Sequence, residues 1–237
     1  MFKFLYANEL KELFTVYGSY YDLFTDDDCK IKCRNILEIY NKTYYKALEK
    51  PIDLFSSIPD SVFVMMNPGS SEPRELGYVE PRVNILDVPD KLKTLRMVFA
   101  KPDVTQYQVM RIMVKMGWDH VRVINLSDIR EAKSVKFFKI VKEFGNKHSD
   151  IHTIFSNVRK FEREAVFRLK KKDSPVVIGW GKDKHLISLA EKAFYYLKDY
   201  NTKGLVSNEH SRLYLHPSPN IQKAKEEWLK KMYNILK

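Results

Sequence analysis

Residues 61–71 read SVFVMMNPGSS, an apolar run that leads directly into a tight turn. The run at 61–66 is apolar except for its first residue, which is typical of a strand buried on both faces of a parallel sheet. Three further short apolar runs follow, and each ends in polar or turn residues. They are VRVINL at 121–126, PVVIGW at 175–180 and LYL at 213–215. We therefore predict four strands of one sheet.

Helical periodicity separates these runs. Apolar residues recur at helical spacing over 104–116, 151–170, 184–198 and 220–236. Alternating strands and helices predict an α/β fold, with a three-layer αβα arrangement around a central, mostly parallel four-stranded sheet. Similar spacing over 7–50 predicts that residues 1–55 form a helical amino-terminal extension. We expect this extension to belong to a single domain that spans residues 1–237.

The composition indicates a folded protein with a polyanionic partner. Of the 237 residues, 44% are hydrophobic and 30% are charged, a balance typical of globular domains and unlike that of disordered chains. The net charge of +11 favours nucleic acid, an anionic membrane or an acidic protein as partner; a surface that is basic throughout is the alternative. No 18-residue apolar run and no signal-peptide pattern occurs, so we expect a cytoplasmic protein without membrane association.

The chain is not expected to hold a metal or a cofactor. Cys29 and Cys33 have no histidine nearby, and free, reduced thiols are the ordinary interpretation of such a pair. The six histidines are scattered, and the chain has no Gly-rich phosphate loop.

Polar or turn residues follow each predicted strand. In a parallel α/β sheet, ligands bind beyond the carboxyl ends of the strands, so these residues are the first candidates for a site. Singly, each motif has an ordinary explanation as a turn, a cap or a rigid loop. Their joint occurrence, one on each strand end, points to a shared site. The motifs are Asn67-Pro68-Gly69, Asn125, Gly179-Trp180-Gly181 and His216-Pro217-Ser218-Pro219.

This set of motifs, over about residues 61 to 221, resembles the uracil-DNA glycosylase superfamily. Members carry a water-activating loop of the GINPG type, a later Asn that reads the pyrimidine, a strand ending in WG and an HPSP-type loop. The spacing of 58 residues between Asn67 and Asn125 is also similar. The resemblance implies a uracil-DNA glycosylase-like fold, DNA as the partner and hydrolysis of an N-glycosidic bond. Two residues depart from the family's pattern. Asn67 stands where the most efficient uracil enzymes have Asp, and Asn220 stands where the family often has a Leu that wedges into the base stack.

The resemblance also implies roles for individual residues. Asn67 holds the attacking water, and His216 stabilises the anion of the leaving base as a neutral donor. Asn125 reads the base edge, and it pairs with uracil or thymine in one amide orientation and with cytosine in the other. Gly69 admits a pyrimidine with a bulky C5 substituent, or serves only the turn. Tyr78 stacks on the extruded base, or is simply packed.

Other residues are candidates for contacts with the DNA backbone. Hydroxyl and ammonium groups that flank the motifs are suited to phosphate oxygens. Hydrogen bonding within turns is the alternative for the serines, and a solvated surface is the alternative for the lysines. The candidates are Ser70, Ser71, Ser218, Lys182 and Lys184.

The resulting hypothesis is a monomeric DNA glycosylase that flips out a modified or mismatched pyrimidine and leaves an abasic site. A bulky 5-substituted cytosine of phage DNA, as in antiviral defence, is one such base. Three alternatives stay open: a non-catalytic module that reads a flipped base, a plain uracil or thymine-mismatch repair enzyme, and a hydrolase of free nucleosides. The sequence also leaves open a lysine that cleaves the abasic strand.

Overall fold

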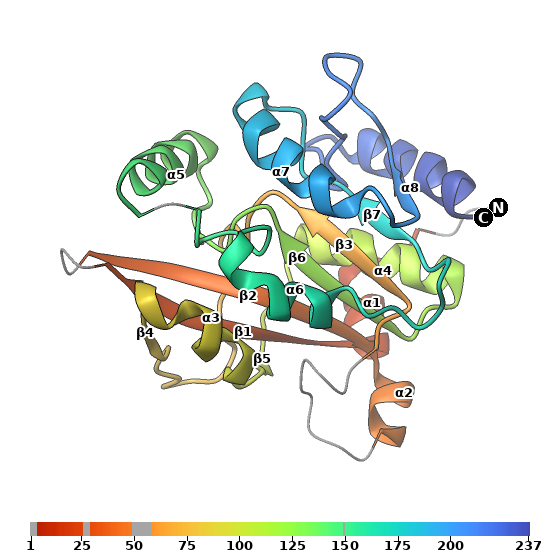
Figure 1. The fold of residues 1–237 in the computed structure, drawn as a ribbon. Coiled ribbons are helices and arrows are strands. Elements are labelled where there is room, and N and C mark those ends of the chain that lie inside the picture. Colours follow the sequence, from red (N-terminus) through yellow and green to blue (C-terminus); the bar gives the residue numbers. More distant parts are fainter. Residues whose placement is uncertain (1–3, 26–28, 49–57, 149) are drawn as a thin grey trace.

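A mixed eight-stranded sheet runs through the described residues, 4–25, 29–48, 58–148 and 150–237, of the computed structural model (Figure 1). The strand order is β4-β1-β2-β6-β3-β7-β8, and β5 pairs with β1. The strands are β1 (Phe14–Phe24), β2 (Lys30–Asn41), β3 (Ser61–Met65), β4 (Arg82–Asn84), β5 (Val98–Phe99), β6 (His120–Asn125), β7 (Val176–Ile178) and β8 (Thr202–Gly204).

One half of this sheet is parallel, and it contains three of the four strands that the sequence predicts. Strands β6, β3, β7 and β8 lie side by side, and each neighbouring pair is parallel. The predicted strands at 61–66, 121–126 and 175–180 correspond to β3, β6 and β7, which are buried along their whole length.

The prediction of a fourth strand at 213–215 is wrong. Tyr214 makes only isolated antiparallel bridges to Gly181 and Val206, and β8 takes the fourth parallel place. The apolar character of this run has another cause, because Leu213 is buried in the core without extending the sheet. Strand β8 escaped prediction because its sequence, TKG, has no apolar run.

The prediction of a helical amino-terminal extension over 1–55 is also wrong. The predicted number of four strands is therefore wrong as well, because the sheet has eight. Strands β1 and β2 form a long antiparallel hairpin, and among the described residues of this region only α1 (Ala7–Leu13) and α2 (Lys42–Ala47) are helical. The hairpin is buried on both faces along most of its length, so its apolar residues do not alternate as they do in a half-exposed strand. Residues 1–3, 26–28 and 49–55 of the extension lie outside the described residues.

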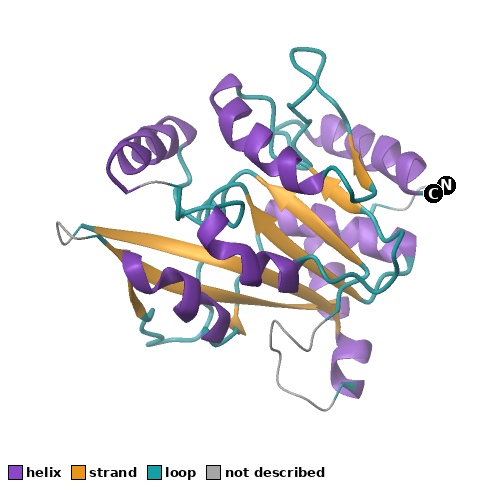
Figure 2. Cartoon of the chain, in the orientation of Figure 1, coloured by secondary structure: helices purple, strands orange, loops and turns teal. Residues whose placement is uncertain are grey.

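Helices cover both faces of the sheet (Figure 2). On one face, α1 packs with α4 (Val104–Met116) and α8 (Gln222–Leu236) against alternate sheet residues such as Phe63 and Val123. The other face is covered by α3 (Val88–Lys91), α5 (Ser134–His148), α6 (Lys160–Val166) and α7 (Ile187–Leu197). Two apolar cores therefore flank the sheet, as in a three-layer αβα fold.

Most of the predicted helices are confirmed. The periodicities at 104–116, 184–198 and 220–236 correspond to α4, to α7 with the 3-10 turn before it, and to α8. Of the region 151–170, only α6 and a short 3-10 turn at Asn157–Arg159 are helical. Helix α5 was not predicted.

Candidate functional site

The carboxyl ends of β3 and β6 meet, and this brings Asn67 beside Asn125. The backbone N–H groups of Leu126 and Ser127 donate to the carbonyls of Met65 and Met66, at 2.8 and 3.2 Å. The two motifs that lie 58 residues apart in the sequence therefore share one edge of the sheet.

The side-chain amide of Asn67 is held in one orientation. Its Nδ2 donates to the carbonyl of Glu131 at 2.7 Å and to that of Ile129 at 3.3 Å. Within the described residues, no protein group donates to its Oδ1. Asn67 thus presents an acceptor that is suited to holding a water molecule.

Asn125 is buried, and its amide is held between two groups of opposite character. The guanidinium of Arg34, on β2, can only donate, and the backbone carbonyl of Asn67 can only accept. The amide oxygen of Asn125 must therefore face Arg34 Nη2, at 3.1 Å, and its nitrogen must face the Asn67 carbonyl, at 3.2 Å. One lone pair and one N–H of the amide remain for a ligand.

The HPSP loop packs at the same edge, on the β7 side. Gly179 follows β7, and a Cβ added there would lie 2.9 Å from the ring of Pro217 and 3.3 Å from the sulfur of Met65. The Pro217 carbonyl accepts from Gln108 Nε2 at 2.8 Å, which anchors the loop to α4. The loops around residues 67 and 216 therefore lie at one edge of the sheet.

His216 is held as a neutral donor. Burial lowers the pKa of its imidazole, although the Ser218 N–H and the charge of Asp103 act in the opposite direction. Its Nδ1 accepts from the backbone N–H of Ser218 at 3.2 Å, so the single ring proton sits on Nε2. A neutral imidazole with Nε2–H available is the form that donates to an oxyanion.

The loop after β3 carries three of the candidate residues, Gly69, Ser70 and Ser71. Gly69 has a φ of +61°, a left-handed conformation that favours glycine, and a Cβ added there meets no atom within 4 Å. The turn thus favours glycine, and the space beside it is open. Ser70 is exposed, whereas Ser71 is buried and its hydroxyl lies 3.0 Å from the hydroxyl of Tyr20.

Tyr78 lines a separate open cavity of about 1080 Å³ with Arg74, Glu80 and Arg130. Asn67, Asn125 and His216 do not line this cavity. Tyr78 is half-buried and packs against the apolar core on the α4 side of the sheet. The structure therefore places Tyr78 at the wall of a neighbouring cavity.

The remaining candidates lie near the HPSP loop and after β7. The hydroxyl of Ser218 is buried and has no hydrogen-bond partner among the described residues. Lys182 and Lys184 are exposed, and Lys182 pairs with Glu209 at 2.6 Å. Part of the charge of Lys182 is thus already balanced.

Two residues of the hairpin, Arg34 and Tyr20, reach this site and were missed by the sequence analysis. They lie opposite each other on β2 and β1. Tyr20 contacts Ser71, and the guanidinium of Arg130 lies over its ring at 5.0 Å. No motif marks either residue, because their place depends on the hairpin that the helical interpretation overlooked.

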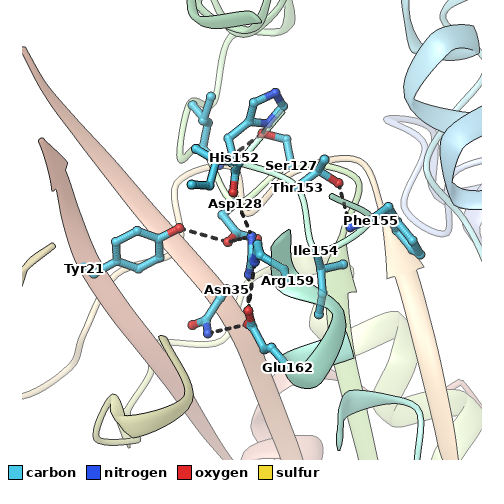
Figure 3. Close-up of polar contacts among 12 residues, drawn as sticks. Tyr21, Asn35, Ser127, Asp128, His152, Thr153, Ile154, Phe155, Arg159 and Glu162 are labelled. Atoms are coloured by element: carbon cyan, nitrogen blue, oxygen red, sulfur yellow. Dashed lines mark hydrogen bonds and ion pairs between the residues drawn. The ribbon is translucent and has the colours of Figure 1, made fainter. Parts of the chain in front are cut away.

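A buried ion network holds the hairpin to the rest of the sheet (Figure 3). Arg159 Nη1 donates to Asp128 Oδ2 at 2.6 Å, and its Nε donates to Glu162 Oε2 at 2.8 Å. Tyr21, on β1, donates to Asp128 at 2.9 Å, and Asn35, on β2, donates to Glu162 at 3.0 Å. Burial raises the pKa of Asp128 to about 6, although the charge of Arg159 opposes the shift. This network fixes β1 and β2 against the residues that follow β6.

The described residues contain no group of three His, Cys, Asp or Glu side chains that could hold a metal ion. None of the helices in that part of the chain is long and apolar enough to cross a membrane. Comparison of the chain with protein-family models, with curated proteins and with solved structures gives no match. Membership of the uracil-DNA glycosylase superfamily therefore stays a prediction from the motifs.

Proposed function

We propose that this protein is a DNA glycosylase that extrudes a modified or mismatched pyrimidine and hydrolyses its N-glycosidic bond. The observation that carries the proposal is the meeting of Asn67, Asn125 and the loop of His216 at one edge of the sheet. A water acceptor, an amide that reads a base edge and a neutral imidazole donor are the groups that this reaction needs. The net charge of +11 supports a nucleic-acid partner.

In the proposed reaction, Asn67 Oδ1 accepts a hydrogen bond from the attacking water. The water oxygen bonds to C1′ as the bond from C1′ to the base breaks, and the electron pair of that bond leaves with the base. An amide cannot take the water proton at neutral pH, so the proton passes to solvent or to the departing base. The reaction therefore depends on an oxocarbenium-like sugar and on stabilisation of the leaving anion.

His216 stabilises this anion by donating its Nε2–H to O2 of the base. One such donor contributes roughly 3–4 kcal/mol to the transition state. The lowered pKa of the imidazole suits this role, because burial favours the neutral ring, and the neutral ring still carries the Nε2 proton that it donates to the base.

The open space beside Gly69 favours a base with a bulky C5 substituent. A 5-substituted cytosine of phage DNA, excised in antiviral defence, is one substrate of this kind; uracil or mismatched thymine is the smaller alternative. A separate candidate function is a non-catalytic module that reads a flipped base. It is favoured by the absence of a carboxylate at position 67, where efficient catalysis would use one.

A panel of duplexes tests the proposal. The duplexes carry uracil, a thymine mismatch, hydroxymethylcytosine or glucosylated hydroxymethylcytosine, and abasic product is scored as alkali-labile strand breaks. We expect product from at least one modified pyrimidine, and loss of product in Asn67→Ala and His216→Ala. Product from uracil alone rejects the bulky-base preference. Tight, salt-sensitive binding without any product favours the non-catalytic module.

A further inference from the structure

Arg34 enters the candidate site from an irregularity in the hairpin. Ser19 pairs with Ile36 and Tyr20 pairs with Arg34, so Asn35 is an extra residue, a β-bulge. Bulges redirect neighbouring side chains and are frequent beside functional sites. This bulge is pinned from both sides, because Ser19 donates to the Asn35 side chain and Asn35 donates to Glu162.

The guanidinium of Arg34 is buried without a bonded carboxylate among the described residues, and the charges of Asp103 and Asp128 stabilise it only from beyond ion-pair distance. The residue is 3% exposed, and the described residues offer it no carboxylate within ion-pair distance. Its Nε has no hydrogen-bond partner in the part of the chain that the structure describes. Burying a cation in this way costs free energy, so Arg34 needs an interaction that explains why it is buried here. The side-chain contact that the structure gives Arg34 is to the oxygen of Asn125.

This contact fixes which end of the Asn125 amide lies on which side of the site. The strand order places β2 on one side of β6, and β3 and β7 on the other. The amide oxygen therefore lies toward β2 and Arg34, and the nitrogen lies toward β3 and Asn67. The loop of His216 lies farther along, against Gly179 after β7.

A base that places O2 at His216 must then turn its remaining edge in a defined direction. Its N3 faces the Asn125 nitrogen, and its 4-substituent faces the Asn125 oxygen. The nitrogen donates, so N3 must accept, and the oxygen accepts, so the 4-substituent must donate. Cytosine has this pattern, with a bare N3 and a 4-amino group. Uracil and thymine have the opposite pattern, with an N3–H and a 4-carbonyl.

We infer that Arg34 is a positioning residue that locks Asn125 to read a cytosine-type edge and to reject uracil and thymine. This inference rests on the proposed function for the location of the base. A uracil edge would put two donors face to face and two acceptors face to face. Each unpaired group of this kind costs enough to weaken binding about tenfold to 100-fold.

Binding to substrates that cannot be cleaved tests this inference directly. Duplexes carry 2′-fluoroarabino-5-hydroxymethylcytosine or 2′-fluoroarabino-5-hydroxymethyluracil opposite an abasic site, so that no base pair has to be broken. We expect the wild type to bind the cytosine form at least about tenfold more tightly than the uracil form. Arg34→Met should bring the ratio close to one, while Arg34→Lys, which keeps a donor, should retain most of it.

Several outcomes overturn the inference. A wild-type ratio of one or below contradicts the cytosine-type edge, and a ratio that persists in Arg34→Met contradicts the role of Arg34. If Arg34→Met does not fold, Asn125→Ala replaces it, and a ratio that survives this change contradicts the inference as well. Excision is measured separately with cleavable duplexes. Absence of abasic product there counts against the proposed function and leaves the binding ratio to decide the inference.

Discussion

Arg159 and Arg34 are both buried, but their surroundings differ. Arg159 is bonded to the carboxylates of Asp128 and Glu162, and these charges raise its pKa well above its ordinary value despite its burial. Within the described part of the chain Arg34 has no bonded carboxylate, and burial lowers its pKa although the charges of Asp103 and Asp128 oppose the shift. All three nitrogens of the Arg159 guanidinium are bonded to carboxylates, so this cation serves the fold, although Asp128 Oδ1 has no partner among the described residues. A buried cation whose donors are only partly used needs a physical explanation, and for Arg34 the proposed one is that it orients Asn125 for a ligand.

The largest expected effect concerns stability and separates these two regions. Arg159→Met leaves two buried carboxylates without their cation, which should lower the free energy of unfolding by about 3–5 kcal/mol. Arg34→Met removes a buried charge that no described carboxylate bonds, together with one hydrogen bond, and should change that free energy by no more than about 1 kcal/mol. Urea unfolding of both variants measures the difference. Equal losses would show that Arg34 is as structural as Arg159.

His216→Ala should act on rate alone. Loss of its donor is expected to lower the single-turnover excision rate about 100- to 1000-fold, because the leaving anion loses its hydrogen bond. The midpoint of urea unfolding should stay nearly unchanged. A variant that excises at the wild-type rate would remove His216 from the chemistry.

His152 borders the ion network of Arg159 and makes the stability of this region depend on pH (Figure 3). Burial lowers the pKa of its imidazole to about 4, below the unfolded value of about 6.5. The unfolded chain then binds a proton that the folded protein does not, so this contribution is lost as the pH falls from about 6.5 toward 4. Relative to His152→Gln, the wild type should lose about 2 kcal/mol between pH 7 and pH 5. Parallel stability curves for the two proteins would contradict this assignment.

The smallest expected effect concerns contacts with the DNA backbone. Lys184→Ser should lower the slope of log K against log salt by about 0.9, the value for one phosphate contact. Lys182→Ser should lower it by less, because Lys182 is already paired with Glu209. Fluorescence titration over a range of salt concentrations measures both slopes. Unchanged slopes in both variants would place the DNA path elsewhere.

Apolar runs predicted β3, β6 and β7 because these strands are buried on both faces, and helical periodicity predicted α4, α7 and α8. The hairpin of β1 and β2 was missed because its apolar residues face both cores and their spacing resembles that of a helix. Asn67, Asn125 and His216 were found because each belongs to a motif at a strand end. Arg34 was not, because its place depends on a bulge and on a distant network that no local pattern records.

A structure of the protein with DNA that carries a 2′-fluoroarabino pyrimidine would show whether one extruded pyrimidine is held between Asn67, Asn125 and His216. We predict that the base leaves the helix, turns its N3 edge to Asn125 and places O2 within hydrogen-bond distance of His216 Nε2. A base that remains stacked in the duplex, or that occupies the cavity beside Tyr78 instead, would contradict the account.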